Sequence, residues 1–306
     1  MTKITSSSPC SAASGDALMI SLNDMTGAEA RLAARSSNLD KSTSGVASGY
    51  VQANLIILPS RYANDFRNLC ARNPVPCPLI AESRTPGDFT NLKSYLPRVD
   101  DTKLASDLDL RTDCPHFNVY SNSKLAHSAI SDLKQYWSDD HVAFMIGCSQ
   151  SFESAIMNQG LPVRHILHGR TVPMYRTNTA LNPSGVFSGS TYVVSMRTFK
   201  KRDIGKVRDI TRPFSVTHGE PVAWGWDAVK QLGIADIDKV QWGQPPLTED
   251  FRPLSEVFGD DDNVPVFWGC GVTPQEAVMK ASLQGIIMAH YPGEMLIMDC
   301  KEEDII

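Results

Sequence analysis

Residues 142–149 (VAFMIGCS) and 264–271 (VPVFWGCG) share one layout, although they lie far apart in the chain. Each begins with a short apolar run that predicts a buried strand, continues into a tight glycine turn and leads into a helix. The first helix is expected at about residues 151–158. Strand, turn and helix in this order are typical of an α/β protein, in which ligands bind beyond the ends of the strands. Convergence of the two turns would build one site.

The start of the second helix carries its own signals. Thr273 suits the N-cap, Pro274 the first helical position and Glu276 the third, where a carboxylate satisfies a backbone N–H group. Thr26 and Glu29 form a similar capping pattern near the N-terminus and predict a short helix through residue 35. Ordered structure is therefore expected from about residue 25 onward.

Other elements follow from the spacing of apolar residues. Residues 62–72 predict an amphipathic helix, and residues 117–120 alternate like a half-buried strand. The segment 80–110 is polar, with Pro, Gly and Asp throughout, and predicts a long surface excursion.

The chain is long enough for one large domain or two unequal ones. The strand-rich block 160–242 is expected to form a smaller α+β domain. It is inserted into a larger three-layer α/β domain made of residues 25–159 and 243–306. Residues 1–24, which are rich in Ser and Ala, are expected to be a disordered lead-in.

Charge and composition argue against several classes of partner. The 29 basic and 34 acidic residues are interspersed along the chain, so no nucleic-acid partner is expected. No apolar run approaches the ~20 residues that span a bilayer, so no membrane partner is expected either. Seven cysteines without a CxxC pair favour a reducing compartment, and we expect a cytoplasmic location. The mitochondrial alternative calls for a more Arg-rich, less acidic start than this chain has.

The first glycine turn has the chemistry of an anion site. Gly147, Cys148 and Ser149 offer backbone N–H groups at the positive end of a helix dipole, which suits a carboxylate or an oxyanion. The same position lowers the pKa of a thiol, so Cys148 is either a candidate nucleophile or a small buried residue behind the turn. Glu153, in the first turn of the helix, is either a general base or a partner of the dipole. The corresponding candidates in the second turn are Gly269, Cys270 and Gly271.

Polar side chains on the predicted strands are suited to orient a small substrate. Tyr175, Arg176 and Asn178 supply a phenol, a planar bidentate donor and an amide within a few residues. Arg197 ends another predicted strand. Two such arginines near glycine turns fit a ligand the size of a dicarboxylate, although each is also suited to a surface ion pair.

Histidines are the natural candidates for proton transfer near neutral pH. His218 and His290 each stand beside turn residues, where a side chain projects into a cleft, but lone histidines are more often structural. His165 and His168 point to opposite faces if they lie on a strand, so a metal site there requires a helix. The sequence has no P-loop, dinucleotide, hydrolase-elbow or zinc-protease motif, and no cofactor is expected.

Six blocks stand in the chain in a recognisable order: 49–55 (GYVQANL), 109–113 (DLRTD), 146–153 (IGCSQSFE), 172–178 (VPMYRTN), 194–197 (VSMR) and 267–275 (FWGCGVTPQ). Together they resemble the hallmark blocks of the hydro-lyase family related to D-glutamate cyclase. The match runs from about Gly27 to Asp299. It departs from the family pattern in the Ser-rich start, near residues 93–106 and around residues 244–254.

The resemblance implies an α/β fold with a smaller second domain and a lyase that closes D-glutamate to 5-oxo-D-proline with loss of water. The substrate is then a small carboxylate or amino acid. Arg176 and Arg197 are expected to hold its two carboxylates, and the two glycine turns to supply the oxyanion donors. Glu153, His218 or His290 is expected to move the protons.

Two alternatives belong to other classes of protein. One is a module that binds a small carboxylate without turnover. The other is a metal-dependent hydrolase of a cyclic amide, with a loosely held divalent ion on Asp113, Glu153 and His218. The sequence leaves a homo-oligomer open.

Overall fold

The computed structural model describes residues 21–306, so most of the predicted lead-in 1–24 lies outside the described residues. Within that segment, Leu22–Asp24 forms a single 3-10 turn, η1. The predicted capping box is confirmed. The Thr26 hydroxyl accepts from the Glu29 backbone N–H, the Glu29 carboxylate accepts from the Thr26 backbone N–H, and helix α1 runs over Gly27–Arg35.

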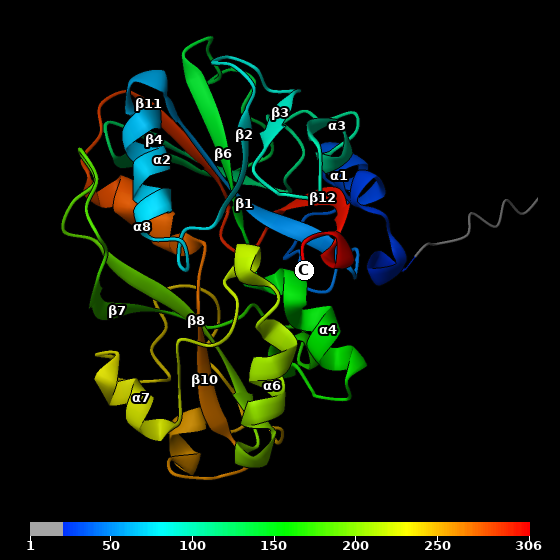
Figure 1. Cartoon of the computed structure of the whole chain (residues 1–306), viewed down its shortest axis with the longest axis vertical. Helices are drawn as coiled ribbons and strands as arrows, with labels where there is room; N and C mark the ends of the chain where they lie inside the picture. The colour runs from blue at the N-terminus through cyan, green and yellow to red at the C-terminus, as the bar shows by residue number, and fades with distance from the viewer. Residues whose placement is uncertain (1–20) are drawn as a thin grey trace, which may run out of the picture.

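Two β-sheets organise the fold, the larger in the upper half of Figure 1 and the smaller in the lower half. The larger has the order β3-β2-β6-β1-β11-β4-β5, and β12 pairs with one end of β1. Its strands are Tyr50–Pro59 (β1), Leu79–Ser83 (β2), Leu92–Ser94 (β3), Phe117–Ser121 (β4), Lys124–Ile130 (β5), His141–Gly147 (β6), Ile286–His290 (β11) and Leu296–Lys301 (β12).

The smaller sheet has the order β7-β8-β10-β9. Its strands are Met174–Ala180 (β7), Thr191–Phe199 (β8), Ala223–Trp224 (β9) and Val264–Gly269 (β10). Neighbouring strands pair antiparallel in both sheets. Three strands of this sheet come from the block 160–242, and β10 joins them from beyond it. The predicted division of the chain into domains stays a prediction.

Helices flank both sheets and confirm the α/β class. They are Ala63–Arg72 (α2), Asp101–Leu104 (α3), Glu153–Asn158 (α4), Arg164–Leu167 (α5), Ile204–Thr211 (α6), Trp226–Gln231 (α7) and Val272–Lys280 (α8). The short 3-10 turns are Ser60–Tyr62 (η2), Ser149–Phe152 (η3), Lys201–Asp203 (η4), Ser215–Thr217 (η5), Leu254–Val257 (η6) and Glu302–Asp304 (η7). Within residues 21–306, no helix combines the length and apolar character needed to cross a bilayer.

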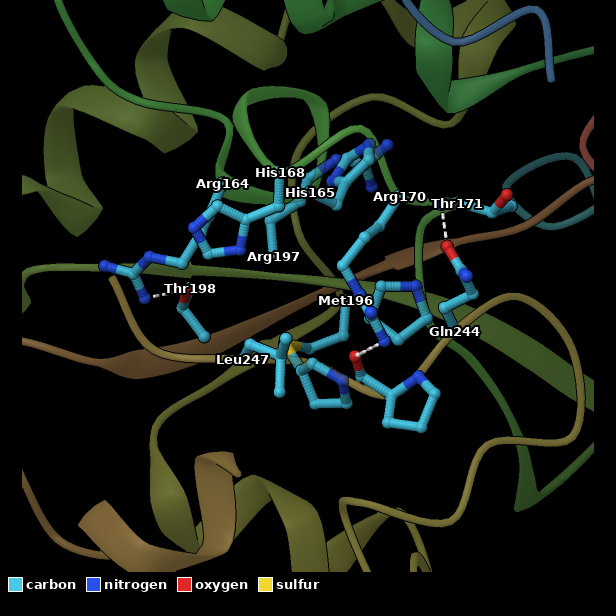
Figure 2. A pocket seen from close by; sticks show the side chains of 13 residues that line it. Arg164, His165, His168, Arg170, Thr171, Met196, Arg197, Thr198, Gln244 and Leu247 are labelled. Atoms are coloured by element: carbon cyan, nitrogen blue, oxygen red, sulfur yellow. Dashed lines mark hydrogen bonds between the residues drawn. The ribbon is translucent and has the colours of Figure 1, made fainter. Parts of the chain in front are cut away.

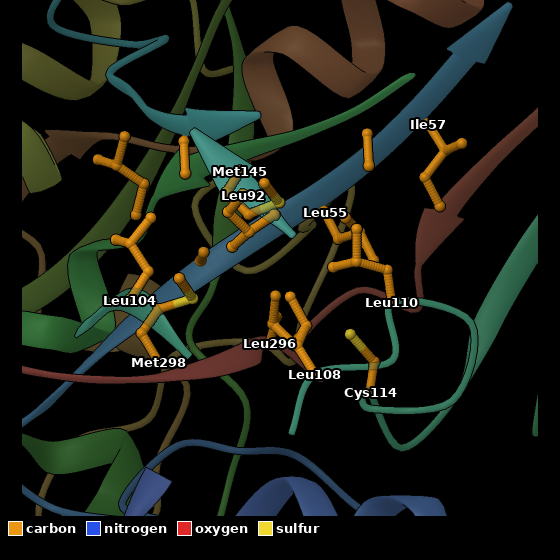
Figure 3. Close-up of a cluster of buried hydrophobic side chains, with 14 of the residues drawn as sticks. Leu55, Ile57, Leu92, Leu104, Leu108, Leu110, Cys114, Met145, Leu296 and Met298 are labelled. Atoms are coloured by element: carbon orange, nitrogen blue, oxygen red, sulfur yellow. The ribbon is translucent and has the colours of Figure 1, made fainter. Parts of the chain in front are cut away.

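The segment 80–110 is not the surface excursion that its polarity predicts. It contributes β2, β3 and α3, and its leucines are buried against β1 and β6 of the larger sheet (Figure 3). Leu92, Leu104 and Leu110 pack there with Leu55 and Met145. The prediction is wrong because these apolar residues are irregularly spaced, so their burial follows from the path of the chain and not from a local period.

Helix α8 also begins differently from its prediction. Gly271 is the N-cap, and Thr273 lies inside the helix. The Thr273 hydroxyl accepts from the Val193 backbone N–H at 2.9 Å and lies 3.1 Å from the Val193 carbonyl. Thr273 therefore does not cap the helix. Its hydroxyl joins α8 to β8, because the backbone of Val193 satisfies it instead.

Candidate functional site

The two glycine turns meet, although they end strands of different sheets. Asn54, which is 1% exposed on β1, lies between them. Its Nδ2 is 3.5 Å from the Gly147 carbonyl, and a Cβ built at Gly271 would lie 1.8 Å from the same nitrogen. The predicted convergence is thus observed, but not for the predicted reason: it follows from the junction between two antiparallel sheets.

The turns are covered by a short segment around η5. A Cβ at Gly147 would lie 2.0 Å from the Val216 carbonyl oxygen, so only glycine allows this approach. His218 follows directly, and its Nδ1 is 3.2 Å from the position of a Cβ at Gly269. The imidazole therefore lies where the two turns and their cover come together.

A cluster of buried charge lies beside the first turn. The Glu153 carboxylate accepts from Arg197 Nε at 2.9 Å and from Arg197 Nη2, and its Oε1 is 3.1 Å from His165 Nε2. Arg197 also donates to the hydroxyls of Ser149 at 3.1 Å and Ser195 at 2.9 Å. We call Glu153, Arg197 and His165 the charge cluster. All three are at least nine-tenths buried.

The charge cluster keeps Glu153 ionised. Burial by itself raises the pKa of this carboxyl, but the charges of His165 and Arg197 and their hydrogen bonds lower it further than burial raises it. Arg197 lies in addition over the rings of Phe152 and Trp268, with its guanidinium carbon 5.2 and 5.3 Å from their centroids. The guanidinium is therefore held rigidly beside the turn.

His218 is neutral and strained. Burial lowers its pKa to about 4 with a smaller contribution from the charge of Arg197, although the carbonyls of Val75 and Gly147 act in the opposite direction. Its φ of +87° is in the left-handed region, which is rare for a residue with a side chain. Nδ1 is 2.8 Å from the Val75 carbonyl and must carry the proton that it donates, so Nε2 has a free lone pair. Among residues 21–306, that buried Nε2 has no hydrogen-bond partner.

The family model for D-glutamate cyclase matches residues 142–299, which include both glycine turns, the charge cluster and His218. The chain belongs to the D-glutamate cyclase family. Membership confirms the resemblance found in the sequence and the predicted enzyme class, a lyase.

Curated relatives of this cyclase-family protein match over most of its length. It is 41% identical over 271 residues to a Schizosaccharomyces pombe protein, covering 89% of this chain and 83% of that one. It is 45% identical over 273 residues to a Bordetella pertussis protein, covering 89% of each. Both relatives bear the name "Putative hydro-lyase". A nitrogen repressor-like protein from Methanococcus jannaschii aligns structurally at a TM-score of 0.37 with 10% identity, which is too distant to support a conclusion.

His290 reaches a different part of the cyclase-family fold. Its Nδ1 is 3.0 Å from the Leu55 backbone N and 2.9 Å from Gln275 Nε2 of α8. Burial lowers the pKa of His290 to about 4, and within the described chain its buried Nε2 also lacks a partner. His290 ends β11 and contacts Leu55, the residue that follows Asn54 on β1, and within the described residues it makes no hydrogen bond to the charge cluster.

Both turn cysteines carry protonated thiols. Burial raises the pKa of Cys148 to about 12 and that of Cys270 to about 11. The predicted lowering of the Cys148 pKa is therefore wrong, because removal from water outweighs the N–H groups of the turn. The Cys270 thiol donates a weak hydrogen bond to the Met174 sulfur at 3.5 Å.

The three candidates on β7 lie away from the charge cluster. Tyr175 is buried in the opposite core, where its hydroxyl donates to the Ile237 carbonyl. Arg176 is half-exposed and pairs with Glu276 at 2.7 Å. Asn178 donates to the Gln231 carbonyl at 3.2 Å.

The two arginines of the predicted clamp are not brought together. Arg176 pairs with Val193 on β8, four residues from Arg197, which is about 13 Å along a strand. The clamp formed by these two residues stays a prediction without a shared contact.

The residues proposed for a divalent ion are also separated. Asp113 pairs with Arg35 at 2.9 Å and lies 3.8 Å from Arg31 Nε, whereas Glu153 and His218 lie at the turns. In the part of the chain that the structure describes, no three His, Cys, Asp or Glu side chains are grouped to hold a metal ion.

Sequence reasoning missed Asn54, Ser195 and His165 as members of the site. Asn54 had a usable signal, because an amide inside the apolar run of β1 needs buried partners. His165 was weighed only as a metal ligand. The structure places it on α5 and directs its ring to Glu153.

Proposed function

We propose that this protein is a lyase that closes D-glutamate to 5-oxo-D-proline with loss of water, or acts in the same way on a related small carboxylate. The observation that carries the proposal is Arg197, a buried cation held at the meeting point of two glycine turns and a neutral histidine. Membership of the D-glutamate cyclase family supports the same reaction.

The reaction sets three chemical demands. The amine nitrogen attacks the γ-carboxyl carbon, a C–N bond forms, and one carboxyl oxygen leaves as water. Two protons of the substrate ammonium group are transferred to the oxygen that leaves as water. The site must therefore attract a carboxylate, stabilise a tetrahedral oxyanion and accept a proton from the amine.

The residues at the turns match these demands. Arg197 supplies positive charge in a site shielded from water, where electrostatic attraction is strong. The Ser149 and Ser195 hydroxyls accept from Arg197 and lie 3.3 Å apart, so one donates to the other and a single hydroxyl proton is left for an oxyanion. The backbone N–H groups of Gly147, Cys148 and Cys270 already donate to carbonyls of the chain, so the turns supply fewer free donors than their sequence predicts. His218 Nε2 has the free lone pair of a base, and Glu153 acts as the residue that positions Arg197 and His165.

A proton NMR time course tests the proposal. The purified protein, supplemented with a divalent metal, is incubated with D-glutamate or with 5-oxo-D-proline, and L-glutamate is the control. Interconversion confined to the D series supports the cyclase, and His218→Gln is then expected to slow it at least a hundredfold. Absence of turnover from either side, with ligand still raising the melting temperature, would favour another small carboxylate as substrate.

A further inference from the structure

A small pocket next to the charge cluster is lined by basic side chains (Figure 2). Of the thirteen described residues that line it, none carries a carboxylate. The basic members are Arg164, His165, His168, Arg170 and Arg197. Its volume of about 20 Å³ holds one or two water-sized groups, which is the size of a carboxylate.

Arg170 has an unused hydrogen-bond donor in this pocket. Its Nη2 donates to the Pro245 carbonyl at 3.0 Å, whereas its Nε is buried and, within residues 21–306, has no acceptor. An unpaired buried donor on a charged group costs free energy, so an acceptor supplied by a ligand is favoured here. The Arg170 guanidinium is thus held at Nη2 by the chain and keeps its Nε–H group for a ligand.

None of the described residues that line the pocket carries a negative charge that would neutralise its arginines. Burial first, and then the charges of Arg164 and Arg170, lower the pKa of His168, as expected where cations face one another. Arg164 donates to Thr198 and Asn263. The carboxylates that act on Arg164 lie outside the pocket, on Glu249, Asp250 and Asp260.

The pocket adjoins the site of the proposed reaction. His165 and Arg197 both line it, and both bind Glu153. The opposite wall comes from residues 244–247, within the segment that departs from the family's sequence pattern. A ligand in the pocket therefore lies between two residues of the charge cluster and the wall formed by residues 244–247.

We propose that the pocket binds one carboxylate of the substrate, with Arg170 as the principal donor. The inference rests on the proposed function and assigns to Arg170 the part that the sequence suggested for Arg176. A substrate with a second carboxylate then binds more tightly than one that lacks it.

Glutarate and butyrate test the assignment, because they differ by one carboxylate. Calorimetry is used to compare wild type, Arg170→Gln and the matched control Arg212→Gln, whose exposed arginine pairs with Asp209 and does not line the pocket. Wild type and Arg212→Gln are expected to bind glutarate at least tenfold more tightly than butyrate. Arg170→Gln is expected to lose that preference, and Arg170→Lys, which keeps the charge and guards against a folding defect, to retain part of it.

An unchanged glutarate preference in Arg170→Gln would overturn the proposal. So would Arg170-dependent binding of inorganic phosphate that does not compete with glutarate, because the pocket would then serve a separate anion. Failure of the cyclase reaction is seen independently, as absence of D-glutamate turnover in wild type. The binding comparison needs no turnover and is judged by itself.

Discussion

Two clusters of buried charge in this protein come from hallmark blocks of the sequence, and they have different surroundings. Asp113 of the block 109–113 pairs with Arg35 and faces Arg31, whose guanidinium also binds Asp299 at 2.7 Å and the Ile297 carbonyl at 2.8 Å. These contacts fasten α1 to β12 and to the loop before β4.

The cluster of Glu153, Arg197 and His165 is more deeply buried, and it borders a pocket, two glycine turns and a histidine with a free lone pair. Buried ion pairs in hallmark blocks therefore do not by themselves mark chemistry, and neither does an unused donor, because Arg31 Nε in the first cluster also lacks a partner among the described residues. The pocket, the glycine turns and the neutral histidine beside the second cluster make the difference.

The largest expected effect is on turnover, from Arg197→Lys. Lysine keeps the charge but loses the planar fork that holds Glu153, Ser149 and Ser195 together. We expect kcat on D-glutamate to fall at least a hundredfold, as measured by the NMR assay. A variant with kcat within threefold of wild type would remove Arg197 from the reaction.

Asp113→Asn is the matched change in the other cluster. It leaves Arg35 and Arg31 without one carboxylate and should lower the free energy of unfolding by about 3 kcal/mol. Urea denaturation measures that loss. Turnover per folded molecule is expected to stay at the wild-type value, and a drop comparable to that of Arg197→Lys would erase the distinction between the clusters.

Two buried histidines, one beside the charge cluster and one away from it, make the stability of the fold depend on pH. His218 and His290 have pKa values of about 4 in the folded protein, below the 6.5 of a free histidine. Their depressed values stabilise the fold fully above pH 6.5, and this stability is lost as the pH falls toward 4, because the unfolded chain binds the protons more tightly.

The loss is on the order of 2 to 3 kcal/mol for each histidine. Urea midpoints from pH 4 to 8 measure it. His218→Gln and His290→Gln should each reduce the slope below pH 6.5 by a similar amount, and a slope unchanged in both variants would show that other groups cause it.

Glu302 gives a smaller effect of opposite sign. Burial raises its pKa to about 7, although the Ser154 hydroxyl donates to the carboxylate. The folded state thus holds this proton more tightly, so the contribution of Glu302 to stability is greatest below pH 4.5 and is lost as the pH rises toward 7, opposing the effect of the histidines. The expected change is about 2 kcal/mol. In Glu302→Gln, stability should therefore rise more steeply between pH 5 and 7 than in wild type; an unchanged profile would point to another acid.

Much of the fold was predictable from local patterns. The capping box at Thr26, the helix over residues 63–72 and the strands that precede both glycine turns are observed as expected. These features depend on neighbours within a few residues, so periodicity and capping suffice to predict them. The burial of the segment 80–110 was not predictable in this way, because it depends on contacts with strands distant in the sequence.

The candidate site likewise has features that follow from local sequence and features that follow from long-range contacts. Local sequence blocks identify the family, the two glycine turns and the candidates Glu153, Arg197 and His218. The packing of the chain places Arg197 in a buried pair with Glu153 and Arg176 in a half-exposed pair with Glu276. Packing also brings His165 into the charge cluster, since burial and charge depend on residues that the fold brings together from distant parts of the chain.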